Sequence, residues 1–241
     1  MTRRLALTAS SVVACLAFLA PAGSGTAAVV VSFASATSCD GPQMGTVGND
    51  ALVGTTLSDS FSGLAGNDTL VGGAGDDCLD GGAGNDSLSG AAGKDSLKGS
   101  SGKDFLVGGN DDDGLGGGPG KDTLDGSSGK DVLAGDAGKD TLKGNVDDDK
   151  LDGGAGGDRL GGGAGKDVLD GGAGDDTLSD GTGDHTLTDS EGTNVLRGDS
   201  GNDVLNIDDG KRDTASCGSG VDRVIADPKD KVVDCERVRR R

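Results

Sequence analysis

The chain has 241 residues and a composition that excludes an ordinary globular core. It contains 49 Gly and four Phe but no Trp or Tyr, and only 32% of its residues are hydrophobic. Such a glycine-rich, acidic composition is typical of disordered chains unless a sequence repeat organises the few apolar residues. The net charge of −19 disfavours nucleic acid and anionic membranes as partners and favours cations.

The N-terminal segment has the features of a secretory signal peptide. Arg3 and Arg4 form a basic start, an apolar stretch covers residues 5–20, and small residues follow over 22–28, where we expect cleavage. The residues around Cys15 loosely resemble a lipoprotein box, but the apolar run continues beyond the cysteine, which favours a signal peptide over lipidation. We therefore expect a secreted, extracellular protein whose mature chain has no integral membrane segment.

An apolar residue then recurs at every ninth position from Leu52 to Leu205, eighteen times without an insertion. Two residues before it stands an Asp, except at His185 and Asn194. Nine residues suit a short strand, whose central side chain points inward, followed by a tight turn in which glycine supplies positive φ angles. Two strands and two turns make one coil of eighteen residues, and stacked coils pair parallel strands.

These repeats resemble a known family. Residues 72–80, GGAGDDCLD, fit at every position the G-G-x-G-x-D-x-U-x pattern of the RTX (repeats-in-toxin, hemolysin-type) calcium-binding nonapeptide proteins. The resemblance implies an all-β fold, a right-handed parallel β-roll, with multiple Ca²⁺ ions held between turns one coil apart. Hard carboxylate and carbonyl oxygens suit Ca²⁺. Without an effector domain beside its repeats, the chain looks like the small exported, repeat-only calcium-binding proteins common in actinobacteria.

The resemblance implies that turn aspartates are the metal ligands. The expected ligands are Asp50, Asp68, Asp77, Asp86, Asp95, Asp104, Asp122, Asp131, Asp140, Asp158, Asp167 and Asp176. Alternate turns fall on opposite edges of the roll. One edge keeps Gly at the first and fourth positions of each turn, whereas residues such as Asp111 and Asp147 interrupt the other. We expect calcium to fill the continuous edge first. Lysines beside its ligands, such as Lys103, are either solvated or weaken the middle sites.

The repeat divides the chain into four parts: a signal peptide (1–28), an N-terminal cap (29–44), the calcium-binding β-roll (45–206) and a C-terminal cap with a basic tail (207–241). One apolar side chain per repeat is a small core for so much ordered backbone. A ladder of aspartates without cations would also repel itself. We therefore expect the chain to be disordered without calcium and to fold on binding it.

The cysteines fit an exported protein. Cys15 leaves with the signal peptide, and Cys39, Cys78, Cys217 and Cys235 remain as an even number. Three pairings are formally possible. We favour Cys39 with Cys78 and Cys217 with Cys235, because each pair would close one end of the roll, where strand edges are exposed. The second pair is separated by 18 residues, one coil.

Other functions find less support. His185 is the only histidine and occupies a degenerate turn, so we interpret it as a former ligand position rather than a catalytic or pH-sensing group, and we expect no enzymatic activity. Phe105 and Arg159 interrupt the outward row that ice binding would need. Calcium-dependent adhesion to an envelope or matrix polymer stays open. The arginine-rich C-terminus is then either a solvated tail or a contact for anionic polymers. We expect a monomer.

Overall fold

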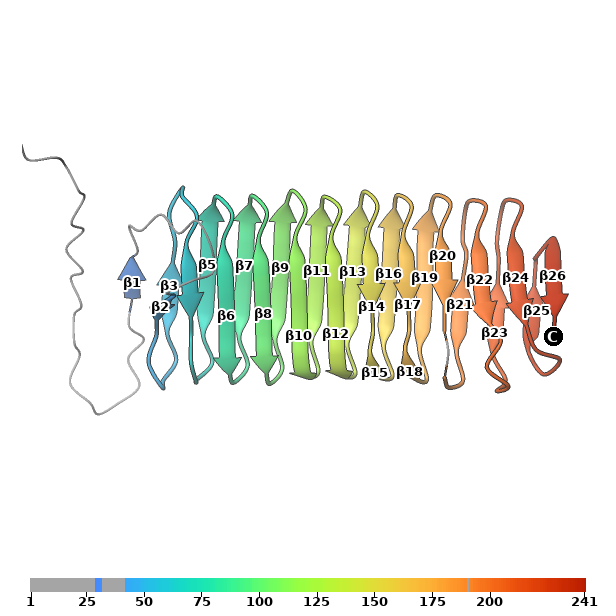
Figure 1. Ribbon diagram of the computed structural model, residues 1–241, viewed down its shortest axis with the longest axis horizontal. Coiled ribbons are helices and arrows are strands. Elements are labelled where there is room, and N and C mark those ends of the chain that lie inside the picture. The colour runs from blue at the N-terminus through green and yellow to red at the C-terminus, as the bar shows by residue number, and fades with distance from the viewer. Residues whose placement is uncertain (1–28, 32–41, 190) are drawn as a thin grey trace, which may run out of the picture.

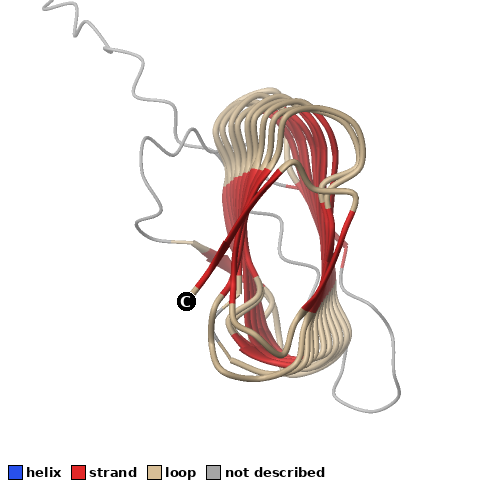
Figure 2. Ribbon diagram, turned by 90° about the vertical axis from the view of Figure 1, so that its right-hand side faces the viewer, coloured by secondary structure: helices blue, strands red, loops and turns tan. Residues whose placement is uncertain are grey.

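The fold is a β-solenoid of two parallel sheets. The computed structural model describes residues 29–31, 42–189 and 191–241, so the predicted signal peptide and Cys39 lie outside the described residues. Strands alternate between the sheets along the chain, and the coils stack in a single row (Figure 1). Viewed from the end, the sheets form two facing layers joined by turns at two edges (Figure 2). This architecture confirms the predicted parallel β-roll.

Each sheet collects alternate strands, apart from two short strands that lie in the same sheet as the strand before them. The first contains β1 (Val29–Val31), β3 (Ala51–Val53), β5 (Thr69–Ala74), β7 (Ser87–Ala92), β9 (Phe105–Asn110), β11 (Thr123–Ser128), β13 (Thr141–Val146), β16 (Arg159–Ala164), β19 (Thr177–Thr182), β21 (Val195–Arg197), β23 (Thr214–Ser216) and β25 (Lys231–Val233). The second contains β2 (Gln43–Met44), β4 (Ser60–Ser62), β6 (Cys78–Ala83), β8 (Ser96–Ser101), β10 (Gly114–Gly120), β12 (Val132–Gly138), β14 (Lys150–Asp152), β15 (Ala155–Gly156), β17 (Val168–Asp170), β18 (Ala173–Gly174), β20 (Thr186–Thr188), β22 (Val204–Ile207), β24 (Arg223–Ala226) and β26 (Arg237–Arg240). The described residues contain no helix, and therefore none that could span a membrane.

The core lies between the sheets and is built from the nine-residue apolar repeat. Neighbouring strands pair with an offset of eighteen residues, so that Leu70 lies opposite Leu88. All eighteen repeat positions are at most 3% exposed, from Leu52 to Leu205, with Phe61 the one aromatic among them. Because successive side chains of a strand point to opposite faces, the residues on either side of each leucine face outward.

Most central strands are longer than the repeat predicts. β5 to β13 have six or seven residues and run on into the first half of the following turn. Turn residues pair across coils as strand residues do, as in Gly73 with Ala91. The N–H of Gly84 likewise donates to the carbonyl of Ser101, at 2.8 Å. Because the turns stack in the same register as the strands, the hydrogen-bond ladder continues round the edges.

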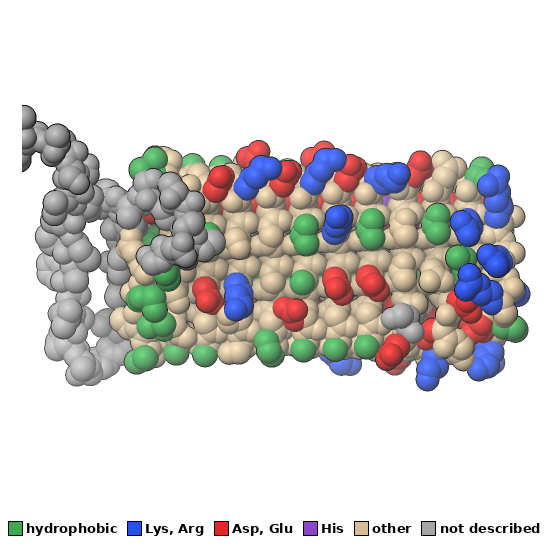
Figure 3. All heavy atoms as spheres, viewed as in Figure 1, with side chains coloured by type: hydrophobic (Ala, Val, Ile, Leu, Met, Phe, Trp, Pro, Cys, Tyr) green, Lys and Arg blue, Asp and Glu red, His purple; other side chains and the backbone are tan. Residues whose placement is uncertain are grey.

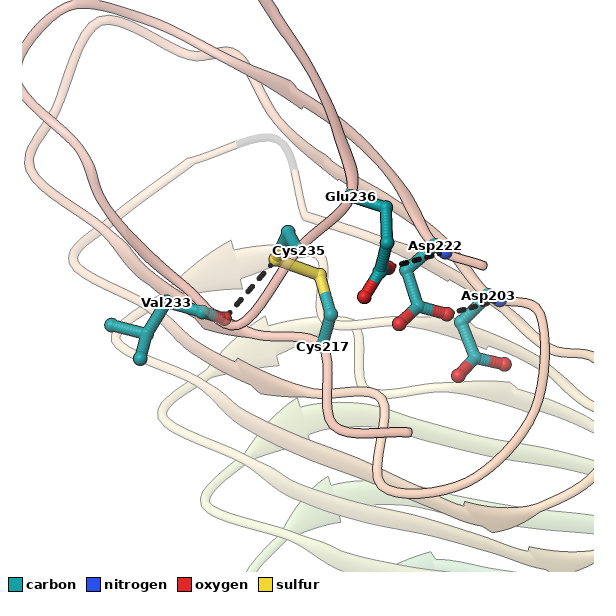
Figure 4. Close-up of a disulfide and its surroundings, with 6 residues drawn as sticks. All are labelled: Asp203, Cys217, Asp222, Val233, Cys235 and Glu236. Atoms are coloured by element: carbon teal, nitrogen blue, oxygen red, sulfur yellow. Dashed lines mark hydrogen bonds between the residues drawn. A yellow bond between two sulfur atoms is a disulfide. The ribbon is translucent and has the colours of Figure 1, made fainter. Parts of the chain in front are cut away.

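At the C-terminal end the two sheets continue past the expected boundary at residue 206. Leu205 pairs with Val224, and Val224 with Val238. Cys217 and Cys235, eighteen residues apart, form the predicted disulfide that joins the last two coils of the first sheet (Figure 4). Cys78 also forms a disulfide.

Candidate metal sites in the turns

We number each nonapeptide so that positions one to six form the turn and positions seven to nine the strand, with the core residue at eight. Position six, two residues before the core leucine, turns inward although it is acidic. The aspartates there are at most 4% exposed from Asp50 to Asp203, and His185 and Asn194 are equally buried. The inward turn of these carboxylates creates two rows of buried acids, one along each edge of the roll.

One oxygen of each position-six carboxylate holds the coils together. The backbone N–H of Asp86 donates to Oδ1 of Asp104, one coil later, at 2.8 Å. The same contact recurs along both rows at 2.6–2.9 Å. Nδ1 of His185 and Oδ1 of Asn194 accept the equivalent N–H groups, so these two substitutions keep this structural role.

The second oxygen is buried and has no partner. From Asp68 to Asp176, Oδ2 of every position-six aspartate is inaccessible to solvent and accepts no hydrogen bond. In proteins the great majority of buried polar atoms have a hydrogen-bond partner. A row of buried carboxylate oxygens without partners therefore points to a cation. The first turn of each row differs: the backbone N–H and hydroxyl of Thr46 donate to Oδ2 of Asp50, and those of Thr55 donate to Oδ2 of Asp59.

The glycine at position one leaves the space that faces this oxygen. A methyl group added to Gly99 would lie 2.6 Å from Oδ2 of Asp104 and 2.7 Å from the carbonyl oxygen of Gly117, one coil later. Gly153 has the same surroundings, with Asp158 Oδ2 at 2.8 Å and the next carbonyl at 2.6 Å. A carboxylate and a carbonyl therefore converge on each glycine-lined cradle, and this is the hard oxygen donor set that Ca²⁺ takes.

Glycine serves the turn in two different ways. Position four has a positive φ in most turns, such as +107° at Gly75. Asp111 adopts the same region at +71°, which is uncommon for a residue with a side chain. Gly99, at position one, is outside the positive-φ region and is required instead for space. The sequence expectation of positive φ therefore explains only part of the glycine pattern.

Burial makes the position-six carboxylic acids weaker acids than aspartates in water. It raises the pKa of Asp77 to about 7 and that of Asp122 to about 6. The N–H group that each accepts opposes the rise, and the neighbouring carboxylates of the row add to it. The pKa values of Asp113 and Asp149 rise to about 7 for the same reasons. An ionised row is therefore costly unless a positive charge lies in the cradles.

The structure places all the predicted ligands at equivalent positions in the two rows. It places Asp59, Asp113, Asp149 and Asp203 there as well. These four residues were not among the ligands predicted from the sequence. The signal that identifies them is the register itself, since each stands two residues before a core position. Lys103, by contrast, is exposed at the rim of the turns, which favours the solvated interpretation of that lysine.

Comparison with protein families gives an independent result. The family model described as the RTX calcium-binding nonapeptide repeat matches residues 44–77, 53–88, 80–115, 89–124, 116–151, 125–160, 144–178, 161–184 and 179–211. These overlapping segments cover the turns described above. Among curated proteins, none matches the chain.

Proposed function

The chain belongs to the RTX calcium-binding nonapeptide repeat family, and from this premise we propose that it is a secreted protein whose folding is driven by Ca²⁺ bound between stacked turns. The observation that carries the proposal is the row of buried, unpartnered Oδ2 atoms. The position-six aspartates would supply carboxylate oxygens and the position-one glycines carbonyl oxygens. Bound calcium would supply the positive charge that the rows lack.

The chain's own groups define how calcium and folding are coupled. In the unfolded chain the aspartates are solvated and far apart, whereas the fold brings them together every eighteen residues and removes them from water. From Asp68 to Asp176, each position-six carboxylate accepts an N–H of the preceding coil with Oδ1, as Asp104 does from Asp86, so that Oδ2 alone is free to bind an ion. Ion binding and coil formation therefore occur together, and the free energy of metal binding is part of the free energy of folding.

Calcium titration of the full chain tests the proposal. Equilibrium dialysis gives the number of ions bound, and circular dichroism of the same samples gives the β-structure. We expect a largely disordered chain in chelator and a β-rich chain in millimolar calcium. Magnesium should substitute poorly, because it demands tight octahedral geometry and dehydrates reluctantly. Identical spectra in chelator and calcium would contradict the proposal.

The C-terminal end favours a second candidate, calcium-dependent adhesion to an anionic envelope or matrix polymer. Basic side chains gather at this end, with some acidic side chains among them (Figure 3). Arg237 and Arg239 of β26 are exposed, whereas Arg240 donates to the carbonyl oxygen of Asp227 at 2.6 Å. Replacing Arg237 and Arg239 by Ser should abolish binding to immobilised polyglycerol phosphate in calcium. The Arg159→Ser variant, changed in the middle of the roll, should bind normally.

A further inference from the structure

Two turns of the roll differ from the rest at two positions at once. The turn that carries His185 at position six has Asp180 at position one, and the turn that carries Asn194 at position six has Asp189 at position one. Every other repeat turn has Gly at position one and Asp at position six. Each of these two turns therefore still has a carboxylate, at position one instead of position six.

The moved carboxylates lie inside the roll. The side chain of Asp180 is fully buried and that of Asp189 is 2% exposed. Neither oxygen of either carboxylate has a hydrogen-bond partner. Position one is where glycine elsewhere leaves the cradle open, and each of these aspartates therefore extends its own carboxylate into the cradle.

Around Asp180 the unpartnered groups converge. One ligand atom each from Asp180, His185 and Asp203 lies within 4.8 Å of the other two. Oδ1 of Asp203 is used by the N–H of His185, at 2.9 Å, but its Oδ2 is buried and free. Nε2 of His185 is also buried without a partner, in a residue that is 2% exposed. Two buried carboxylates and an imidazole nitrogen thus face one another with no compensating positive charge.

The donor set differs from that of the calcium cradles. Ca²⁺ takes oxygen ligands, whereas an imidazole nitrogen combined with carboxylates suits Zn²⁺ and neighbouring first-row divalent ions. The ring is also held from behind, because Nδ1 lies 3.0 Å from the backbone nitrogen of Asp167 and 3.3 Å from its Oδ2. Without a metal ion, Nδ1 accepts that backbone N–H, and the ring proton is therefore on Nε2. A metal ion on Nε2 would displace this proton; Nδ1 would then carry a proton, release the N–H of Asp167 and face Oδ2 of Asp167, the kind of outer partner that metal-bound histidines commonly have.

We propose that Asp180, His185 and Asp203 form a binding site for a single first-row transition-metal ion, of which Zn²⁺ is the natural candidate, within a roll whose other cradles take calcium. The site adds a second kind of metal to the proposed function. It requires the folded roll as its scaffold.

The sister turn provides a matched control. Asn194 offers an amide oxygen where His185 offers a nitrogen, and its N–H donates to Oδ1 of Asp213 in the next coil at 2.8 Å, as that of His185 does to Asp203. The sister turn is therefore an all-oxygen version of the same arrangement. His185→Asn converts the proposed site into the sister type, and Asn194→His makes the reverse change.

Co²⁺ and Zn²⁺ titrations of the calcium-saturated full chain test the proposal. The wild-type chain should bind one equivalent of either ion, and bound Co²⁺ should give a visible d–d absorption band that differs from that of the hydrated ion. His185→Asn should weaken Zn²⁺ binding at least about tenfold, since changes even in outer partners of a metal cost about 10–100-fold. Asn194→His should create a second equivalent.

Circular dichroism in calcium, recorded first on every variant, separates this proposal from the previous one. A wild-type chain that folds in calcium but binds no Zn²⁺ would overturn the transition-metal site and leave the calcium proposal standing. Equal Zn²⁺ affinity in wild type and in folded His185→Asn would overturn it as well. If His185→Asn does not fold, Asn194→His decides: the proposal stands only if this variant binds one Zn²⁺ more than wild type.

Discussion

Replacing Gly99 by Ala perturbs one cradle without touching a charged group. The added methyl would lie 2.6 Å from Oδ2 of Asp104 and 2.7 Å from the carbonyl oxygen of Gly117, whereas ordinary van der Waals contact begins at 3.4 Å. Both oxygens would therefore have to retreat by about 0.7–0.8 Å from the point on which they converge. The φ of Gly99 is outside the positive region, so alanine meets no backbone strain there.

The expected cost follows from that displacement. Overpacking of this kind costs about 1–3 kcal/mol. In a chain of this size, 1 kcal/mol corresponds to about 2–4 °C in the melting temperature, which predicts a fall of about 2–12 °C in saturating calcium. The methyl also occupies the space between the two oxygen donors, and equilibrium dialysis should therefore find one calcium ion fewer.

Gly116→Ala is the matched control. Gly116 lies in β10 at an outward position, its φ is not positive, and a methyl there would meet nothing within 4 Å. This change should be neutral or raise stability by about 0.4–1 kcal/mol through the unfolded chain. Thermal unfolding of both variants in calcium makes the comparison. Equal melting temperatures and equal calcium stoichiometry for the two variants would refute the assignment of position one to the ion cradle.

Three further predictions concern pH, the disulfide and the two edges. In chelator, carboxylates such as Asp77, whose folded pKa of about 7 exceeds the unfolded value of 3.8, contribute stability that is fully present below pH 3.8 and is lost as the pH rises through 7. Circular dichroism of the calcium-free chain should therefore show more β-structure at about pH 5 than at about pH 8, and the opposite order would contradict the burial of these acids. Replacing Cys217 and Cys235 together by Ala should remove about 3 kcal/mol of loop-closure stabilisation, seen as faster hydrogen exchange in the last coils only. Exchange that is faster along the whole roll would count against a local role. Asp86→Ala should raise the calcium midpoint of folding more than Asp113→Ala, because the turn before Asp113 carries a strained residue in place of glycine; an equal or reversed effect would show that the interrupted edge binds as well.

The nine-residue period determined the architecture without any tertiary information. One leucine for every nine residues, kept in register from Leu52 to Leu205, leaves a coil of two strands as the arrangement that buries all of them. The expectation of calcium came instead from the resemblance of the turns to the RTX pattern and from the acidic charge of the chain. Because each coil contacts only its neighbours, local sequence is sufficient to predict such a fold.

Only the tertiary structure decided how the two oxygens of each aspartate are used. The hydrogen bond from Asp86 to Oδ1 of Asp104 joins residues eighteen positions apart, and it leaves Oδ2 as the free ligand. The structure also decided that glycine at position one is required for space, because the atoms it would meet belong partly to the next coil.

The same reason explains why the turn of Asp180 and His185 was interpreted from sequence as degenerate. In the chain, an aspartate at position one is only a missing glycine. Stacking against Asp203 in the following coil makes it one of three groups around a single buried point. Contacts between coils, and not the residues of a turn taken alone, decide which side chains form a site.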